Sequence, residues 1–158
     1  MKKDAVIQGN YRYSLRREWD TDAGQATFVM LNPSTADAEC DDPTIRRCIN
    51  FSKSWGYGSL EVVNLFAYRA TTPYNLFQSA NPVGAKNDQH LQEAVKRAAL
   101  IVIAWGVHGS FLGRDQAVLN LISGKHSLYC LGHTKAGHPR HPLFLKNITQ
   151  PTIFCCCQ

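Results

Sequence analysis

Four short apolar segments of this 158-residue chain each end in a cluster of polar, turn-forming residues. The segments are Thr27–Leu31, Val62–Val63, Ile101–Trp105 and Leu128–Leu131, and the clusters begin at Asn32, Asn64, Gly106 and Gly132. A short run that is apolar throughout is typical of a strand buried on both faces. Open parallel sheets bind ligands just outside the carboxyl ends of their strands. We therefore expect the four clusters to meet at one crevice.

Helical patterns separate the expected strands. Asp42 followed by Pro43 predicts an N-cap and the first turn of a helix, and apolar residues then recur at helical spacing. Gly56 and Gly58 are expected to end this helix. Leu60–Phe66, which includes the apolar pair Val62–Val63, is expected to form the next strand.

The rest of the chain continues the alternation of strand and helix. Asn87 or Asp88 is expected to cap a second helix, and a third is expected around Arg114–Ile122. Tyr11–Trp19 predicts an edge strand or hairpin arm, and 71–84 a long loop with one helical turn. We expect one domain over residues 1–158, a three-layer α/β/α sandwich with a mainly parallel central sheet.

Composition restricts the class of protein. The hydrophobic share of 44% and the charged share of 18% are those of a globular domain with a substantial core. No apolar stretch approaches the roughly 20 residues of a membrane span, and no signal-peptide pattern follows the first residues. These features predict a cytoplasmic protein with no membrane partner.

The net charge of +5 permits a polyanionic partner without requiring one. Charge alone favours a solvated basic surface for each basic group. The groups are Arg12, Arg16 and Arg17; Arg46 and Arg47; and Lys135, Arg140 and Lys146. The last group gains weight as a nucleic-acid contact because it surrounds the His-rich loop at the expected crevice.

The six cysteines contain no Cys-x-x-Cys pair, which argues against a zinc or iron–sulfur site. Cys48 and Cys130 are expected in the core. The three cysteines at 155–157 either finish a strand that begins at Thr152 or form a mobile tail.

Two asparagines occupy chemically useful positions. Asn32, in Asn-Pro-Ser, either caps a turn or fixes a water molecule at the end of a strand. Asn64 either caps its strand or reads a nucleobase edge, because its amide offers a donor beside an acceptor. Arg69, five residues later, is a surface residue or a phosphate contact. Asp37 is a possible extra acid or base near Asn32.

Four of the six histidines lie in Gly-flanked loops after the last two strands, at 108, 133, 138 and 141. His133, His138 and His141 allow a metal site, but no Asp or Glu follows them at a spacing typical of a metal ligand. An imidazole that donates to developing negative charge is the better interpretation. Ser34 and Ser110 lack the Gly-x-Ser-x-Gly context of a catalytic nucleophile.

The order of these motifs resembles the uracil-DNA glycosylase superfamily. A closer resemblance is to a small family of uncharacterised bacterial proteins with the motifs Leu-Asn-Pro-Ser-Thr-Ala-Asp, Asp-Asp-Pro-Thr-Ile-Arg-Arg-Cys, Val-Asn-Leu-Phe-Ala and His-Pro-Leu. These motifs span Leu31 to Leu143. The resemblance implies a uracil-DNA-glycosylase-like fold and a monomeric enzyme that acts on duplex or single-stranded DNA.

The resemblance to glycosylases also implies residue roles. Asn32 would position the attacking water, Asn64 would read the base, and His141 or His138 would stabilise the departing base anion. Phe66 or Tyr68 would stack on the base. The DNA contacts implied are Arg69, Lys135, Arg140 and Ser34. Arg140 and Leu143 are candidates for the wedge that fills the space left by a flipped base.

The implied reaction is base flipping followed by hydrolysis of the N-glycosidic bond, with no metal or organic cofactor. Uracil is the default base, and a bulky modified pyrimidine, as in some phage DNA, is the rival. The role would be base-excision repair or defence against phage. A catalytically silent nucleotide- or nucleic-acid-binding module and a nucleoside hydrolase are the alternative functions.

Overall fold

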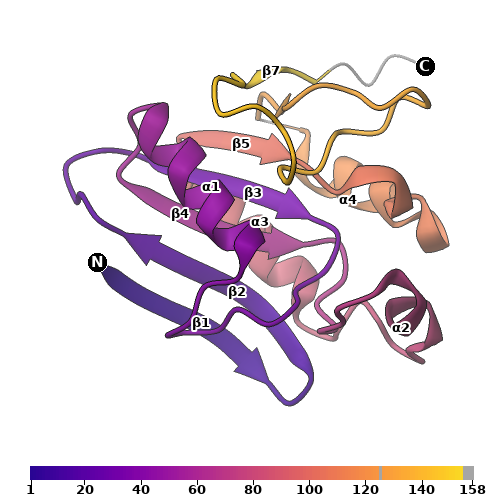
Figure 1. The fold of residues 1–158 in the computed structure, drawn as a ribbon. Helices are drawn as coiled ribbons and strands as arrows, with labels where there is room; N and C mark the ends of the chain where they lie inside the picture. Colours follow the sequence, from indigo (N-terminus) through magenta and orange to yellow (C-terminus); the bar gives the residue numbers. More distant parts are fainter. Residues whose placement is uncertain (125, 155–158) are drawn as a thin grey trace.

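The computed structural model describes residues 1–124 and 126–154 and contains a seven-stranded sheet with helices against it (Figure 1). The strands are β1 (Lys2–Gln8), β2 (Tyr11–Glu18), β3 (Gln25–Met30), β4 (Ser59–Asn64), β5 (Leu100–Ile103), β6 (Tyr129–Cys130) and β7 (Thr152–Ile153). The helices are α1 (Pro43–Ser54), α2 (Pro73–Gln78), α3 (Asn87–Arg97) and α4 (Arg114–Ile122), with short 3-10 turns η1 (Gly106–His108) and η2 (Phe111–Gly113). The expectation for 155–157 lies outside the described residues.

The sheet has the strand order β1-β2-β4-β3-β5-β6-β7 and is mixed. β4, β3, β5 and β6 are parallel, which confirms the parallel centre predicted from the apolar runs. The prediction of a mainly parallel sheet is wrong for the whole, because the other three strand pairings are antiparallel. β2 forms the predicted hairpin with β1 but lies inside the sheet, so β1 is the edge strand.

Helix α1 covers one face of the sheet, as Figure 1 shows. Its N-cap is the predicted Asp42, whose side chain accepts a hydrogen bond from Ile45 N at 2.9 Å. The helix ends at Ser54, with Trp55 as its C-cap just before Gly56, as predicted. The apolar side of α1 packs on β3 and β4 residues that include Phe28 and Val62, and Cys48 lies in this core.

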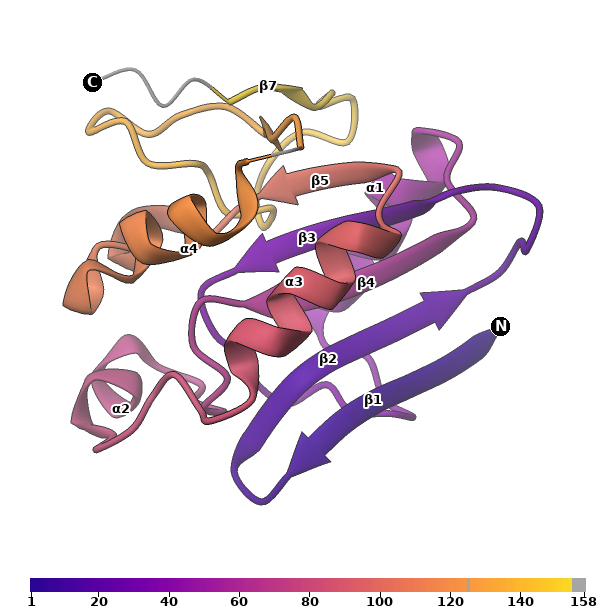
Figure 2. The ribbon, with the colours of Figure 1, turned by 180° about the vertical axis from the view of Figure 1, so that it is seen from behind.

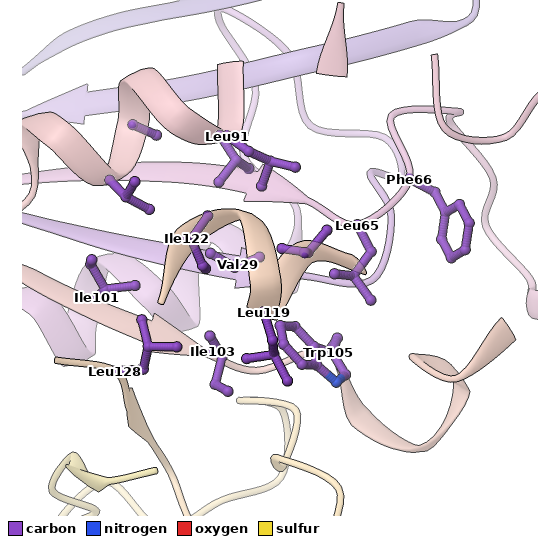
Figure 3. Close-up of a cluster of buried hydrophobic side chains, with 14 of the residues drawn as sticks. Val29, Leu65, Phe66, Leu91, Ile101, Ile103, Trp105, Leu119, Ile122 and Leu128 are labelled. Atoms are coloured by element: carbon purple, nitrogen blue, oxygen red, sulfur yellow. The ribbon is translucent and has the colours of Figure 1, made fainter. Parts of the chain in front are cut away.

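Helices α3 and α4 cover the opposite face, which is turned to the viewer in Figure 2. Their apolar residues form a second core with Val29, Val63 and Ile103, part of which Figure 3 shows. Both faces of the central strands are therefore buried, which is why every residue of β3, β4 and β5 is buried. Cys130 lies in this second core, as predicted.

The start of α3 differs from the prediction. Lys86 is the N-cap residue and makes no side-chain cap, whereas Asn87 is buried inside the first turn. The Asn87 amide instead donates to Asn64 O at 2.9 Å and to Leu65 O at 3.0 Å. Asn87 therefore fixes the end of β4, where the polar cluster begins, rather than the start of its own helix.

The predicted meeting of strand ends is confirmed for three of the four clusters. Met30 of β3 pairs with Asn64 of β4, and Val29 pairs with Ile103 of β5, so these parallel strands end at one edge. The expected strand at Leu128–Leu131 is reduced to the two residues of β6. The loop that follows β6 still reaches the same edge through its tertiary contacts, which are described below.

Candidate functional site

A cavity of about 480 Å³ lies at the carboxyl ends of β3, β4 and β5. This volume falls within the range of about 300–1,000 Å³ that is common for small-molecule sites. Asn32, Asn64 and His141 all line it, as do the start of α1 and the Trp105–His108 turn. Three of the residues singled out in separate stretches of the sequence therefore share one cavity.

Asn32 presents a hydrogen-bond acceptor to this cavity. Its amide nitrogen donates to Ala70 O at 2.9 Å and to Pro33 O at 3.0 Å. Both amide protons are therefore engaged by backbone carbonyls, and the orientation of the side chain is fixed. The Oδ1 atom accepts no hydrogen bond among the described residues, so it is free to receive one from water or a ligand.

Asn64 provides a buried polar group without a partner. The residue is 1% exposed, and its Nδ2 atom makes no hydrogen bond within the described part of the chain. A buried amide in this state costs about 1–3 kcal/mol, which a ligand that accepts a hydrogen bond would offset. Because Asn87 holds the Asn64 carbonyl, the backbone that carries this amide is anchored.

His141 enters the cavity from the loop between Gly132 and Thr149, which has little regular structure. Contacts with other elements hold this loop: Gly106 N donates to Pro139 O at 2.9 Å, and Arg47 Nε donates to Pro142 O at 3.3 Å. Gly109 permits the adjoining turn, because a Cβ there would lie 2.2 Å from the Trp105 ring.

The tautomer of His141 follows from its contacts. Its Nδ1 atom accepts a hydrogen bond from Leu143 N at 3.2 Å, so the neutral ring carries its proton on Nε2. Burial lowers the pKa of His141 below its ordinary value, with the Asp42 carboxylate partly opposing this. His141 is thus a neutral hydrogen-bond donor at pH 7, suited to an anion that develops in the cavity.

We expect the His141 imidazole to titrate below pH 6.5 in the folded protein, measured by NMR and assigned with His141→Asn. Because the folded-state pKa is the lower one, the unfolded chain binds the proton more readily. The stability from neutral His141 is therefore present above pH 6.5 and is lost as the pH falls toward the folded-state pKa. A His141 that titrates above 6.5 would contradict this assignment.

Several residues expected at the site lie elsewhere. Phe66 belongs to the buried core on the α3 face (Figure 3) and is fully buried. Its ring centroid lies 5.5 Å from that of Phe111. Tyr68 packs edge-on against Tyr11. Of the two histidines in His-Pro pairs, His141 lines the cavity and His138 does not. Neither aromatic ring is placed to stack on a ligand there.

Two polar residues expected at the site, Arg69 and Asp37, have other roles in the structure. Arg69 donates to Ser34 O and Thr35 O, so it braces the loop after β3. Asp37 accepts from Glu39 N and Cys40 N, and these bonds lower its pKa. Asp37 is therefore an ionised turn residue outside the cavity rather than an acid or base within it.

A second hollow of about 390 Å³ adjoins the cavity and shares Ser34, Ala70 and Thr71 with it. Arg69 lines this hollow, together with polar residues of α2.

Lys135 and Arg140 are exposed on the loop after β6 and line neither the cavity nor the second hollow. Arg140 donates a hydrogen bond to His133 O.

Sequence reasoning missed two charged residues of the cavity, Arg12 and Asp42. Arg12 and Arg17 are only 2% and 0% exposed, so the expectation of a solvated basic surface is wrong for both. Asp42 was expected only as a helix cap, and it has that role while also lining the cavity. No local pattern distinguishes a buried arginine from an exposed one in a strand of mixed composition.

Within residues 1–124 and 126–154, no three His, Cys, Asp or Glu side chains are grouped to hold a metal ion. No helix in that part of the chain is long and apolar enough to cross a bilayer.

A family model described as a protein of unknown function, DUF1643, matches residues 12–143. No curated protein and no solved structure gives a significant match. The matched segment contains every residue named above as lining the cavity.

Proposed function

This chain belongs to the DUF1643 family of proteins of unknown function, and we propose that it is a DNA glycosylase that removes a pyrimidine base. The observation that carries the proposal is the shared cavity of Asn32, Asn64 and His141. These are the residues that, by resemblance to the uracil-DNA glycosylase superfamily, would hold water, base and departing anion. The fold expected from that resemblance is part of the same proposal.

The free polar atoms of the three residues suit a dissociative hydrolysis. The bond between the sugar and the base nitrogen breaks, and its electron pair leaves with the base. His141 Nε2–H donates to the resulting base anion. Asn32 Oδ1 orients a water whose oxygen attacks the cationic sugar carbon, and the released proton passes to solvent. An amide is sufficient here because water attacks a carbon that is already electron-poor.

The size of the cavity bears on which base is removed. A volume of about 480 Å³ is more than one pyrimidine ring needs. The wall of the cavity is mixed: Ile45 and Val62 are apolar, whereas Asp42 and Thr44 are polar. We propose that the base carries a substituent, which is compatible with a role against phage that modify their DNA as well as with repair.

Phe144 is the wedge residue in this proposal. It is 99% exposed and has a φ of 68°, a left-handed conformation that is strained for an aromatic residue. It follows Leu143, which itself lines the cavity. An exposed apolar ring one residue from the cavity lining is suited to fill the gap that a flipped base leaves. The two wedge candidates from the sequence are Leu143 and Arg140, and Arg140 donates a hydrogen bond to His133 O.

We expect Phe144→Ala to slow base release from duplex DNA by about 10- to 100-fold, because opening a base step costs a few kcal/mol. Release from single-stranded DNA should change by less than about threefold, since no stack must be opened. Single-turnover assays on both substrates measure this difference. Ile148→Ala, another highly exposed apolar residue of the same loop, is the matched control. Equal losses on both substrates would exclude a wedge role.

The glycosylase proposal is tested by incubating the protein with duplex and single-stranded DNA that contains uracil, thymine or enlarged 5-substituted pyrimidines. Abasic sites are scored as alkali-labile breaks, and phage DNA with and without natural base modification is tested in parallel. We expect breaks at one class of pyrimidine, and none with His141→Asn. Absence of breaks in every substrate would overturn the proposal.

A further inference from the structure

Two arginines of β2, Arg12 and Arg17, are buried on the same side of the sheet with very different hydrogen bonding. The guanidinium of Arg17 pairs with Asp41 at 2.8 Å and donates to backbone oxygens that include Asp37 O at 2.6 Å. Among the described residues, the guanidinium of Arg12 makes one hydrogen bond, from Nη1 to Ala36 O at 3.1 Å. Its Nε atom has no partner.

Arg12 also lacks a directly bonded carboxylate, and only the nearby charge of Asp42 partly neutralises it. No acidic residue forms an ion pair with it in the part of the chain that the structure describes. Asp42 is near enough to act through its charge, but its two carboxylate oxygens accept from Ile45 N and Ala36 N. Burial lowers the pKa of Arg12 to about 10, and the positive charges of Arg69 and Arg17 add to this. Arg12 therefore stays protonated at neutral pH.

The charge of Arg12 matters because this residue lines the cavity. Arg17 lies outside the cavity, whereas Arg12 lines it together with Asn64 and Asn32. The first turn of α1 also lines the cavity, where the N-cap carboxylate of Asp42 opposes the positive potential of the helix N-terminus. A buried, incompletely bonded cation is costly, and an anion in the cavity would offset that cost. The fold can satisfy a buried arginine fully, as Arg17 shows, yet leaves the guanidinium of Arg12 only partly hydrogen-bonded.

We propose that Arg12 makes this cavity selective for pyrimidines that carry negative charge. The proposal rests on the proposed function, because it takes a pyrimidine as the ligand. The charge has two chemical sources: an ionised ring nitrogen, as in a departing base, or an acidic substituent on the ring. In either case the guanidinium is the group that attracts the charged edge, while Asn64 bonds the neutral part of the ring.

The test measures binding of three free bases at pH 8 by calorimetry or ligand-detected NMR. Uracil is neutral, 5-nitrouracil is ionised on the ring, and 5-carboxyuracil is ionised on its substituent. We expect the wild-type protein to bind at least one anionic base about 10- to 100-fold more tightly than uracil, the range for hydrogen bonds to charged groups. A preference for 5-nitrouracil identifies the ring as the source, and a preference for 5-carboxyuracil identifies the substituent.

Arg12→Met should bind all three bases with affinities within about threefold of one another. Arg17→Met removes a buried arginine from the same strand outside the cavity and should keep the preference for anions. Arg12→Gln is the second variant, because its amide can still donate to Ala36 O. Circular dichroism and thermal unfolding establish which variants are folded, and the preference of the wild-type protein tests the proposal without any variant.

Equal binding of neutral and anionic bases by the wild-type protein would overturn the role of Arg12 and leave the glycosylase proposal intact. A preference for anions that survives in folded Arg12→Met or Arg12→Gln would also overturn it. Failure of all three bases to bind would count against both proposals. Selective anion binding without any base release from DNA would support Arg12 and contradict the glycosylase.

Discussion

Replacing Asn32 with alanine is expected to lower the rate of base release by about 100- to 1,000-fold, the loss typical when one preorganised hydrogen-bonding group is removed from an active site. The Oδ1 atom of Asn32 is the acceptor that would orient the attacking water. Its direction is fixed because the amide nitrogen is bonded to Ala70 O and Pro33 O. Single-turnover formation of abasic sites measures the effect.

DNA affinity should change by less than about threefold in Asn32→Ala, because the proposed role of the amide is to orient water and not to contact phosphate. Fluorescence anisotropy with an uncleaved duplex measures this separately from turnover. Asn120→Ala, on the exposed side of α4, is the matched control and should leave both quantities unchanged. A catalytically unimpaired Asn32→Ala would remove Asn32 from the mechanism.

The sequence predicts the centre of this fold well because the strongest signals are local. Apolar runs too short for helices predict β3, β4 and β5, and Asp42-Pro43 predicts the start of α1. Parallel strands end at one edge, so the joint position of Asn32 and Asn64 follows from the topology. The chemistry of the candidate site is therefore partly visible before any coordinates are known.

The remaining features depend on contacts between distant segments. The site of His141 is set by Gly106 and Arg47, which bind its loop from two other elements, and no pattern within the loop encodes this. Arg12 is buried and bonded to the Ala36 carbonyl, which lies 24 residues away in the sequence. Asn87 has the composition of a helix cap, yet the nearby end of β4 engages its amide. Local propensity cannot anticipate such tertiary partners.

Replacing Arg97 with methionine is expected to lower the free energy of unfolding by about 2–4 kcal/mol, because it leaves a buried carboxylate without its cation. Glu61 lies in the middle of β4 and is fully buried. Arg97 of α3 donates to both its oxygens, at 3.1 and 2.8 Å, and this hydrogen bonding raises the pKa of Arg97. The Arg97 side chain is 40% exposed, so water limits the loss.

Urea denaturation measures this change, with Lys96→Met as the control for loss of a neighbouring exposed cation, expected within about 0.5 kcal/mol of the wild type. In a Glu61→Gln background, Arg97→Met should cost less than half as much, because no buried charge is then left unpaired. A full-sized loss in that background would mean that Arg97 acts through packing instead. Ser14 and Gln25 also donate to Glu61. The network therefore joins β2, β3 and α3 to β4, the strand that carries Asn64. A loss of stability in Arg97→Met that is absent in Lys96→Met would show that the ion pair with Glu61 stabilises this strand.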